Sequence, residues 1–149
     1  NIMPKEFNHT IKSLDDLQKF AHDFAGSLKG GDVIALSGPL GAGKTTLVQT
    51  AAAELGAKDR VTSPTFTLMK TYALPKSSQD KHHAVQLCHI DLYRVESAKE
   101  SIGFEEYIGD KDYICFIEWP EKAKHLLPKN VISISIDVED RQRIIKKQG

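Results

Sequence analysis

The sequence predicts an α/β fold with a mainly parallel central sheet, on the basis of three observations. Apolar segments of strand length alternate with amphipathic segments of helical spacing. A glycine-rich loop, Gly38 to Thr45, stands between an apolar strand and a helix. Two further apolar strands end in the acidic residues Asp91 and Glu118. Because ligands bind outside the carboxyl ends of parallel strands, we expect one site at that edge of the sheet.

The first expected elements are a strand over residues 5–12 and an amphipathic helix. Ser13 is the expected N-cap, and acidic residues occupy the first turn of this helix. The expected buried face consists of apolar residues at helical spacing, namely Leu14, Leu17, Phe20, Ala21, Phe24 and Leu28. We expect Gly30-Gly31 to end the helix.

The glycine-rich loop joins an expected strand at residues 33–36 to an expected helix at 46–55, which Gly56 ends. An extended segment follows at residues 61–74. Residues 75–83 are rich in polar side chains, and we expect them to form a mobile loop.

Two strands and two helices are expected next, in the order strand 85–91, helix 97–107, strand 113–118 and helix 121–127. Residues 131–138 and 143–147 then predict a C-terminal β-hairpin that turns at Glu139-Asp140. The elements together predict a phosphate-loop NTPase-like sandwich, with one domain over residues 1–149.

Composition limits the classes of function. The chain has 149 residues, with 20 basic and 20 acidic side chains and a formal net charge of zero. A protein that grips nucleic acid alone usually carries a basic excess, so any contact with RNA is expected to run through a partner. No apolar run reaches membrane-spanning length, and no signal-peptide pattern opens the chain. We therefore expect a cytoplasmic protein with no membrane contact.

The loop sequence GPLGAGKT matches the phosphate-loop pattern G-x-x-x-x-G-K-[ST]. Its glycines allow backbone N–H groups to surround phosphate oxygens, as the helix that follows directs its positive end toward them. Lys44 is expected to reach the β and γ phosphates, and the Thr45 hydroxyl to bind Mg²⁺. The expected nucleotide-binding residues are Gly38, Pro39, Leu40, Gly41, Ala42, Gly43, Lys44, Thr45 and Thr46. The alternative, a plain glycine-rich turn, does not account for the full pattern between strand and helix.

Two acidic residues are candidates for the metal site. A bound Mg²⁺ requires a carboxylate near the threonine hydroxyl, and both Asp91 and Glu118 end strands that point to this edge. The alternative is that one of them only caps a loop. The hydroxyl-rich run Ser63-Pro64-Thr65 is a candidate switch that senses the γ-phosphate, or else an ordinary Ser-Pro turn.

Three further motifs follow GPLGAGKT in order: VTSPTFTL at 61–68, HIDLYRV at 89–95 and IEWPEK at 117–122. In this combination the chain closely resembles the bacterial TsaE family, the small ATPase of tRNA threonylcarbamoyladenosine biosynthesis. The resemblance spans nearly the whole chain. It implies ATP and Mg²⁺ as cofactors, with Thr45 and Glu118 as metal ligands.

The resemblance also assigns roles to other residues. It implies that Lys44, Asp91 and Thr65 serve catalysis, with Asp91 acting on the attacking water or the metal shell and Thr65 within the switch. It places the base between Leu14 and Arg143. Trp119 is expected to border the site, although a core tryptophan is the alternative.

The resemblance implies a partner as well. Family members support a larger two-protein complex that transfers the threonylcarbamoyl group to the adenosine next to the anticodon, in tRNAs reading codons that begin with A. ATP hydrolysis is expected to reset that complex, and tRNA is expected to be reached only through it. We expect the isolated chain to bind ATP but to hydrolyse it slowly, because the sequence shows no evident arginine or water-positioning glutamine for the γ-phosphate.

Two other classes share the phosphate loop. A small nucleoside or nucleotide kinase needs several arginines to clamp its acceptor, and this chain has only Arg60, Arg94, Arg141 and Arg143. A GTPase-like switch module would need an N/T-K-x-D segment to read the base, and the sequence has none.

Overall fold

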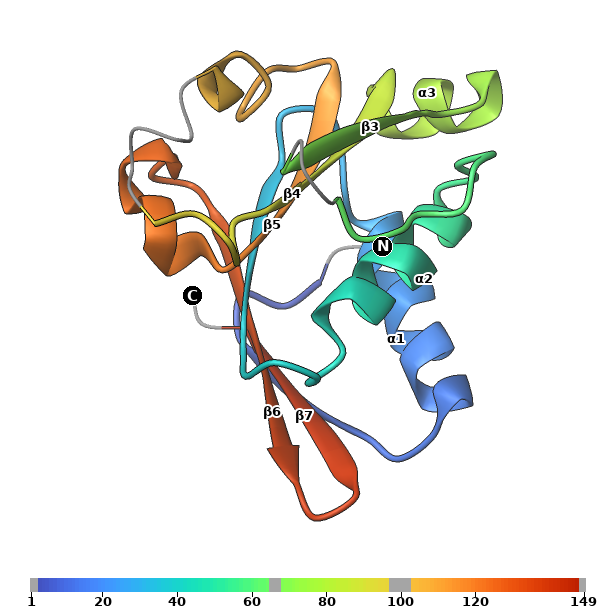
Figure 1. Cartoon of the computed structure of the whole chain (residues 1–149). Helices are drawn as coiled ribbons and strands as arrows, with labels where there is room; N and C mark the ends of the chain where they lie inside the picture. The colour runs from blue at the N-terminus through green and yellow to red at the C-terminus, as the bar shows by residue number, and fades with distance from the viewer. Residues whose placement is uncertain (1–2, 65–67, 97–102, 148–149) are drawn as a thin grey trace.

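A computed structural model describes residues 3–64, 68–96 and 103–147. Within these residues a seven-stranded sheet has the order β1-β7-β6-β2-β5-β4-β3 (Figure 1). The strands are β1 (Phe7–Ile11), β2 (Val33–Ser37), β3 (Met69–Ala73), β4 (Gln86–Asp91), β5 (Tyr113–Glu118), β6 (Ile132–Glu139) and β7 (Gln142–Lys147). The helices are α1 (Leu14–Gly26), α2 (Lys44–Glu54) and α3 (Lys76–His82), with 3₁₀ helices η2 (Phe104–Glu106) and η3 (Pro120–Leu126).

The centre of the sheet is parallel and its edges are antiparallel. Strands β6, β2, β5 and β4 run parallel, whereas β3 at one edge and the pair β1 and β7 at the other run antiparallel to their neighbours. The hairpin of β6 and β7 turns at Asp140, which has φ 55°. The predicted α/β fold, with its mainly parallel sheet and C-terminal hairpin, is confirmed.

Hydrophobic side chains fill both faces of the sheet. Helices α1 and α2 pack on one face, and η2 and η3 lie on the other (Figure 1). On β2, Ile34 and Leu36 point into the cluster under α1 and α2, whereas Val33 belongs to the opposite cluster. This alternation follows from the two-residue period of a strand. Because β2, β4 and β5 run parallel, their carboxyl ends lie at one edge of the sheet, beside the start of α2.

The ends of α1 agree only in part with the sequence prediction. The Ser13 hydroxyl accepts a hydrogen bond from the Asp16 N–H at 3.1 Å, so the predicted N-cap is confirmed. The helix ends at Gly26 rather than at Gly30-Gly31. There the Ser27 hydroxyl donates to the Phe24 carbonyl at 2.6 Å and competes with the next helical turn.

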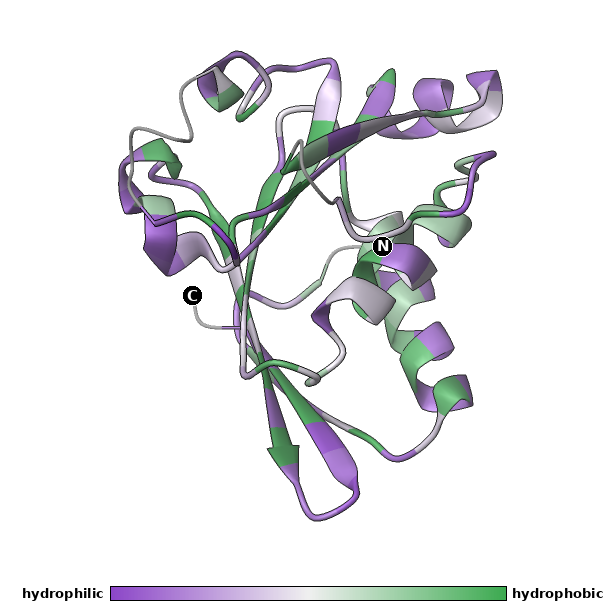
Figure 2. Cartoon of the chain, in the orientation of Figure 1, coloured by the Kyte–Doolittle hydropathy of each residue, from purple (hydrophilic) through white to green (hydrophobic). Residues whose placement is uncertain are grey.

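The prediction of a mobile loop at residues 75–83 is wrong, because this segment contains α3. Figure 2 shows α3 as mostly hydrophilic, so its sequence has no apolar residues at helical spacing from which a helix could be predicted. Its buried side is polar: Ser78 and His82 are buried, and His82 Nδ1 donates to the Leu28 carbonyl at 2.6 Å. The helix ends at His82, and its C-cap residue His83 has φ 56°.

Two further helices were predicted later in the chain, and their described parts contain 3₁₀ rather than α-helix. The helix predicted at 97–107 lies partly outside the described residues, and its described part contains η2. The helix predicted at 121–127 is the 3₁₀ segment η3, with a kink at Ala123.

Candidate functional site

The phosphate loop connects β2 to α2 along a path that requires glycine. Gly38 has φ +149°, and a Cβ at this position would collide with the Ile136 carbonyl oxygen of β6. Gly43, with φ +109°, takes a left-handed conformation as it enters α2. Because a larger residue is strained at both positions, glycine is needed for the loop to follow this path.

Lys44 is the cation of the loop. Its side chain is buried at 4% exposure, and its Nζ donates a hydrogen bond to the Gly38 carbonyl. The same Nζ lies 3.6 Å from the ring centroid of Trp119. Burial lowers the pKa of Lys44, while the nearby Glu118 carboxylate opposes this shift. The loop therefore holds a positive charge against its own carbonyl groups and an aromatic face.

Thr45 and Glu118 meet at the start of α2. The Thr45 hydroxyl lies 3.1 Å from Glu118 Oε1 and 3.0 Å from Oε2, and Ser63 Oγ lies 3.5 Å from that hydroxyl. Glu118 is only 3% exposed, and its Oε2 also accepts from His89 Nε2 at 2.6 Å. A hydroxyl and a carboxylate this close offer the hard oxygen ligands that Mg²⁺ prefers.

The oxygen ligands of this pair fit a metal that is bound mainly by nucleotide and water. In the described parts of the chain, no cluster of three or more His, Cys, Asp or Glu side chains could hold a metal ion. Mg²⁺ commonly takes one or two protein carboxylates and completes its shell with phosphates and water. The Thr45 and Glu118 pair therefore suits Mg²⁺ better than a metal that needs a complete protein cage.

Asp91 lies opposite Glu118 in the register of β4 and β5. Its Oδ1 accepts a hydrogen bond from the Tyr93 N–H at 3.0 Å. Burial raises the pKa of Asp91, the Glu118 carboxylate raises it further, and the bond from Tyr93 opposes both effects. Asp91 is thus a partly buried carboxylate without the tight partners that hold Glu118.

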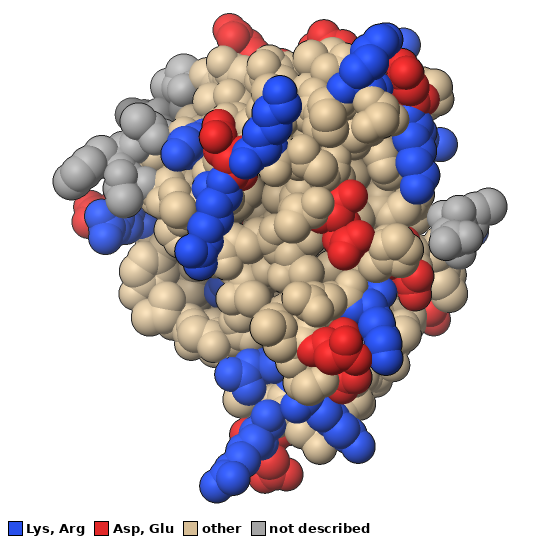
Figure 3. Space-filling view, turned by 90° about the vertical axis from the view of Figure 1, so that its right-hand side faces the viewer, with Lys and Arg blue, Asp and Glu red and all other residues tan. Residues whose placement is uncertain are grey.

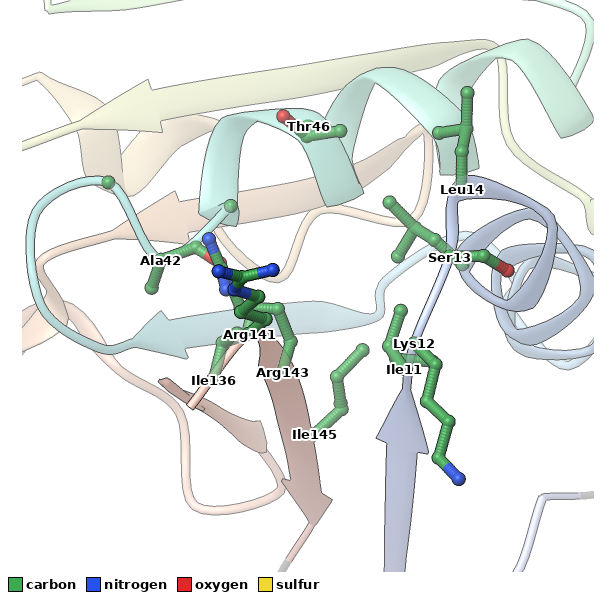
Figure 4. Close-up of a pocket in the computed structure, with 13 residues that line it drawn as sticks. Ile11, Lys12, Ser13, Leu14, Ala42, Thr46, Ile136, Arg141, Arg143 and Ile145 are labelled. Atoms are coloured by element: carbon green, nitrogen blue, oxygen red, sulfur yellow. The ribbon is translucent and has the colours of Figure 1, made fainter. Parts of the chain in front are cut away.

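Two cavities meet at the phosphate loop. The acidic pocket, of about 270 Å³, is lined by Lys44, Thr45, Ser63, Asp91, Glu118 and Trp119, among others. The hairpin pocket, of about 380 Å³, is lined by Ile11, Ser13, Leu14, Arg141, Arg143 and Ile145, among others (Figure 4). Gly41, Gly43 and Thr46 line both. The two pockets are therefore neighbours on either side of the loop.

The hairpin pocket brings the predicted base-binding residues Leu14 and Arg143 together. Arg143 Nε donates to the Ala42 carbonyl at 2.9 Å, and Figure 4 shows Arg143 and Ala42 at the same end of the pocket. Leu14 is 62% exposed at the start of α1. The geometry brings the two residues to one cavity, and their contact with a base stays a prediction.

The other predicted site residues lie around the acidic pocket. The Pro39 carbonyl is 3.5 Å from Lys44 Nζ, and Leu40, at 71% exposure, lines the mouth. Trp119 lines the pocket, as the resemblance implied. Thr65 lies outside the described residues, and Ser63 of the same run lines the pocket.

Sequence reasoning missed His89 and Tyr93. His89 is two residues before Asp91 on a strand, so the two-residue period places both side chains on one face. That period was the available signal for His89. Tyr93, which lines the acidic pocket and contacts the Trp119 ring at 5.2 Å between centroids, follows the strand and had no such signal.

Comparison with known proteins identifies the family. The model of the family described as "Threonylcarbamoyl adenosine biosynthesis protein TsaE" matches residues 11–145. The chain belongs to the TsaE family. Its TsaE resemblance, first seen in the four motifs, is confirmed.

Several TsaE proteins are similar over most of their length. The chain is 35% identical to tRNA threonylcarbamoyladenosine biosynthesis protein TsaE of Rickettsia prowazekii, over 91% of this chain and 89% of the relative. It is 38% identical to the protein of the same name from Aquifex aeolicus, over 89% and 88%. The crystal structure of Bacillus subtilis YdiB superposes with a TM-score of 0.74 at 29% identity, covering 99% of this chain and 87% of that one.

Among the described residues, no helix is both long enough and apolar enough to cross a membrane.

Proposed function

We propose that this TsaE-family chain is a Mg²⁺-dependent ATP hydrolase that supports threonylcarbamoyl modification of the adenosine next to the anticodon, in tRNAs reading codons that begin with A. The observation that carries the proposal is the approach of the Thr45 hydroxyl to Glu118, 3.0 Å from its Oε2, inside the pocket that also holds Lys44 and Asp91. Phosphoryl transfer depends mainly on positioning and charge neutralisation, and this pocket offers the groups for both.

Each side chain has a distinct role in this proposal. Thr45 and Glu118 would hold Mg²⁺, which supplies charge neutralisation on the phosphates when bound. Lys44 exchanges its bonds to loop carbonyls for bonds to phosphate oxygens. The Asp91 carboxylate has lone pairs that the bond from Tyr93 does not use. It can therefore accept a hydrogen bond from the attacking water or from a metal-bound water.

The hairpin pocket is the proposed site of the adenine base. It adjoins the phosphate loop through Gly41, Gly43 and Thr46, so a nucleotide can extend from one cavity to the other. Apolar side chains such as Leu14 and Ile145 offer a surface for a ring, and Arg143 offers a planar guanidinium beside it.

We propose that the larger two-protein threonylcarbamoyl transferase complex activates ATP hydrolysis by this chain, in the cytoplasm. Hydrolysis in turn resets that complex. The acidic pocket has no arginine among its described lining residues; Arg141 and Arg143 line the hairpin pocket, and Arg94 lines a neighbouring cavity with Asp91 and Tyr93. An arginine or an ordered loop supplied on binding would then raise turnover, as in other phosphate-loop enzymes.

Contact with tRNA is proposed to run only through the partner complex. The chain has a net charge of zero, and Figure 3 shows Lys and Arg residues interspersed with Asp and Glu residues on the side that carries α1 and α2. A protein that binds RNA directly would be expected to gather its basic side chains on one surface.

The testing experiment is a steady-state ATPase assay with and without the purified partner proteins. The isolated chain is expected to bind ATP and hydrolyse it slowly, and the partners to raise turnover by on the order of 10³-fold. Thr65→Ala should blunt this activation more than it weakens ATP binding. Lys44→Ala, which removes the cation of the loop, is the control that should abolish tight binding and activation together.

Fast hydrolysis by the isolated chain, with no response to the partners, would contradict the proposal. Labelled phosphate recovered on an added nucleoside would instead indicate a kinase. Preference for GTP over ATP in a binding assay would indicate a switch module.

A further inference from the structure

His89 is a buried polar residue that the proposed chemistry does not use directly. It lies on β4, is 0% exposed, and shares a sheet face with Asp91. Its Nε2 lies 2.6 Å from Glu118 Oε2, whereas its Nδ1 is buried without a hydrogen-bond partner among the described residues. An unpartnered buried nitrogen is unfavourable, so packing alone does not explain a histidine at this position.

The hydrogen-bond pattern determines which nitrogen carries the proton. A carboxylate only accepts hydrogen bonds, so Nε2 must donate to Glu118. In the neutral ring Nδ1 then bears a lone pair, and no buried N–H is left without an acceptor. His89 therefore presents one fixed donor to one carboxylate oxygen.

We propose that His89 is a positioning residue that orients the Glu118 carboxylate for Mg²⁺. The His89 Nε2–H group, inside the sheet, donates to Glu118 Oε2. The Thr45 hydroxyl lies 3.1 Å from Oε1 and 3.0 Å from Oε2 of the same carboxylate. Rotation of the carboxylate about its last torsion would break the His89 bond, so that bond keeps both oxygens in the plane that faces Thr45. This inference rests on the proposed function, since it assigns Glu118 to the metal.

His89 itself is not a candidate ligand. Its complete burial and its engaged Nε2 separate it from the acidic pocket, whose described lining includes Glu118 but not His89. It acts only through the carboxylate, as residues that hydrogen-bond to metal ligands commonly do.

The test measures how much Mg²⁺ strengthens ADP binding, by calorimetric titration with excess Mg²⁺ and with EDTA. His89→Leu removes the donor, and is expected to reduce the gain from Mg²⁺ by about tenfold while leaving the EDTA affinity unchanged. His89→Gln, whose amide can donate from a similar position, is expected to restore most of the gain. Leu87→Val, on the same strand and face, is the control for a general loss of packing and should keep the full gain.

The outcomes separate this inference from the proposed function. Wild-type protein without any gain from Mg²⁺ would overturn both. A wild-type gain that His89→Leu retains, or that Leu87→Val loses equally, would overturn only the role of His89. If His89→Leu does not fold, His89→Asn takes its place, because its amide is polar yet too short to reach Glu118.

Discussion

Glu118 joins three parts of the molecule through one carboxylate. It ends β5, lies within hydrogen-bond distance of the Thr45 hydroxyl at the first turn of α2, and accepts from His89 on β4. Asp91 is its neighbour across the paired strands β4 and β5. The Asp91 carboxylate accepts a hydrogen bond from the Tyr93 backbone N–H. This difference predicts different roles for two acids that look equivalent in sequence.

Glu118→Ala and Asp91→Ala should therefore fail in different ways. Glu118→Ala is expected to lose most of the Mg²⁺-dependent gain in ADP affinity, because it removes the carboxylate whose oxygens lie 3.0 Å and 3.1 Å from Thr45 Oγ1. Asp91→Ala is expected to keep that affinity and to lower turnover by about 10²-fold or more, as for loss of a general base. Nucleotide titrations and single-turnover hydrolysis distinguish the two. The reverse pattern would exchange the roles.

At this scale the sequence predicted the reactive groups but not their support. The phosphate-loop pattern and the two strand-ending acids led to Lys44, Thr45, Asp91 and Glu118, which the structure brings into one pocket. His89 was missed although its spacing of two residues from Asp91 places both side chains on one face of β4. Only pairing of β4 with β5 brings it to Glu118.

Among the elements, α1 begins with two local hydrogen bonds between side chain and backbone. The Ser13 hydroxyl accepts from Asp16 N–H, and the Asp16 carboxylate accepts in turn from the Lys12 N–H at 2.9 Å. The two bonds connect the end of β1 to the first turn of α1, at the edge of the hairpin pocket.

Ser13→Ala is expected to lower the free energy of unfolding by about 1 kcal/mol, since one N–H of the first turn loses its acceptor. Ser13→Asp keeps an acceptor and should stay close to wild type, which makes it the matched control. Urea unfolding followed by circular dichroism measures both. Equal stability of Ser13→Ala and wild type would show that the cap contributes nothing in this fold.

The elements differ in how far sequence alone could predict them. The central strands β2, β4 and β5 followed from apolar runs, because most of their side chains are buried as the pattern requires, and the hairpin followed from its turn residues. Helix α3 did not, since its buried contacts come from Ser78 and His82, which are polar. Its helical state depends on contacts such as the bond between His82 and Leu28, 54 residues apart.

At the scale of the whole molecule, the first and last strands share a cavity. Strand β7 lies between β1 and β6, so Ile11 near the beginning of the chain and Ile145 near its end line the hairpin pocket together. Arg143 extends this connection to the phosphate loop through its bond to Ala42, over 101 residues of sequence.

Arg143→Ala is expected to weaken ADP binding by about tenfold, because the loss of a charge-assisted bond leaves the Ala42 carbonyl and the loop less constrained. The gain in affinity from Mg²⁺ should stay as in wild type, since Thr45 and Glu118 are untouched. Arg141→Ala is the matched control, because Arg141 lines the same pocket but the bond to Ala42 belongs to Arg143. Calorimetry that finds both variants equal would remove the role of this bond.

The position of β7 also determines when binding becomes possible during synthesis on the ribosome. The phosphate loop emerges early, but the cavity beside it lacks the side formed by Arg143 and Ile145 until residues 142–147 leave the exit tunnel and insert between β1 and β6. A chain in which β7 is not yet paired therefore carries the loop without one side of the hairpin pocket. A nucleotide that occupies both pockets can stabilise the fold fully only after β7 has joined the sheet.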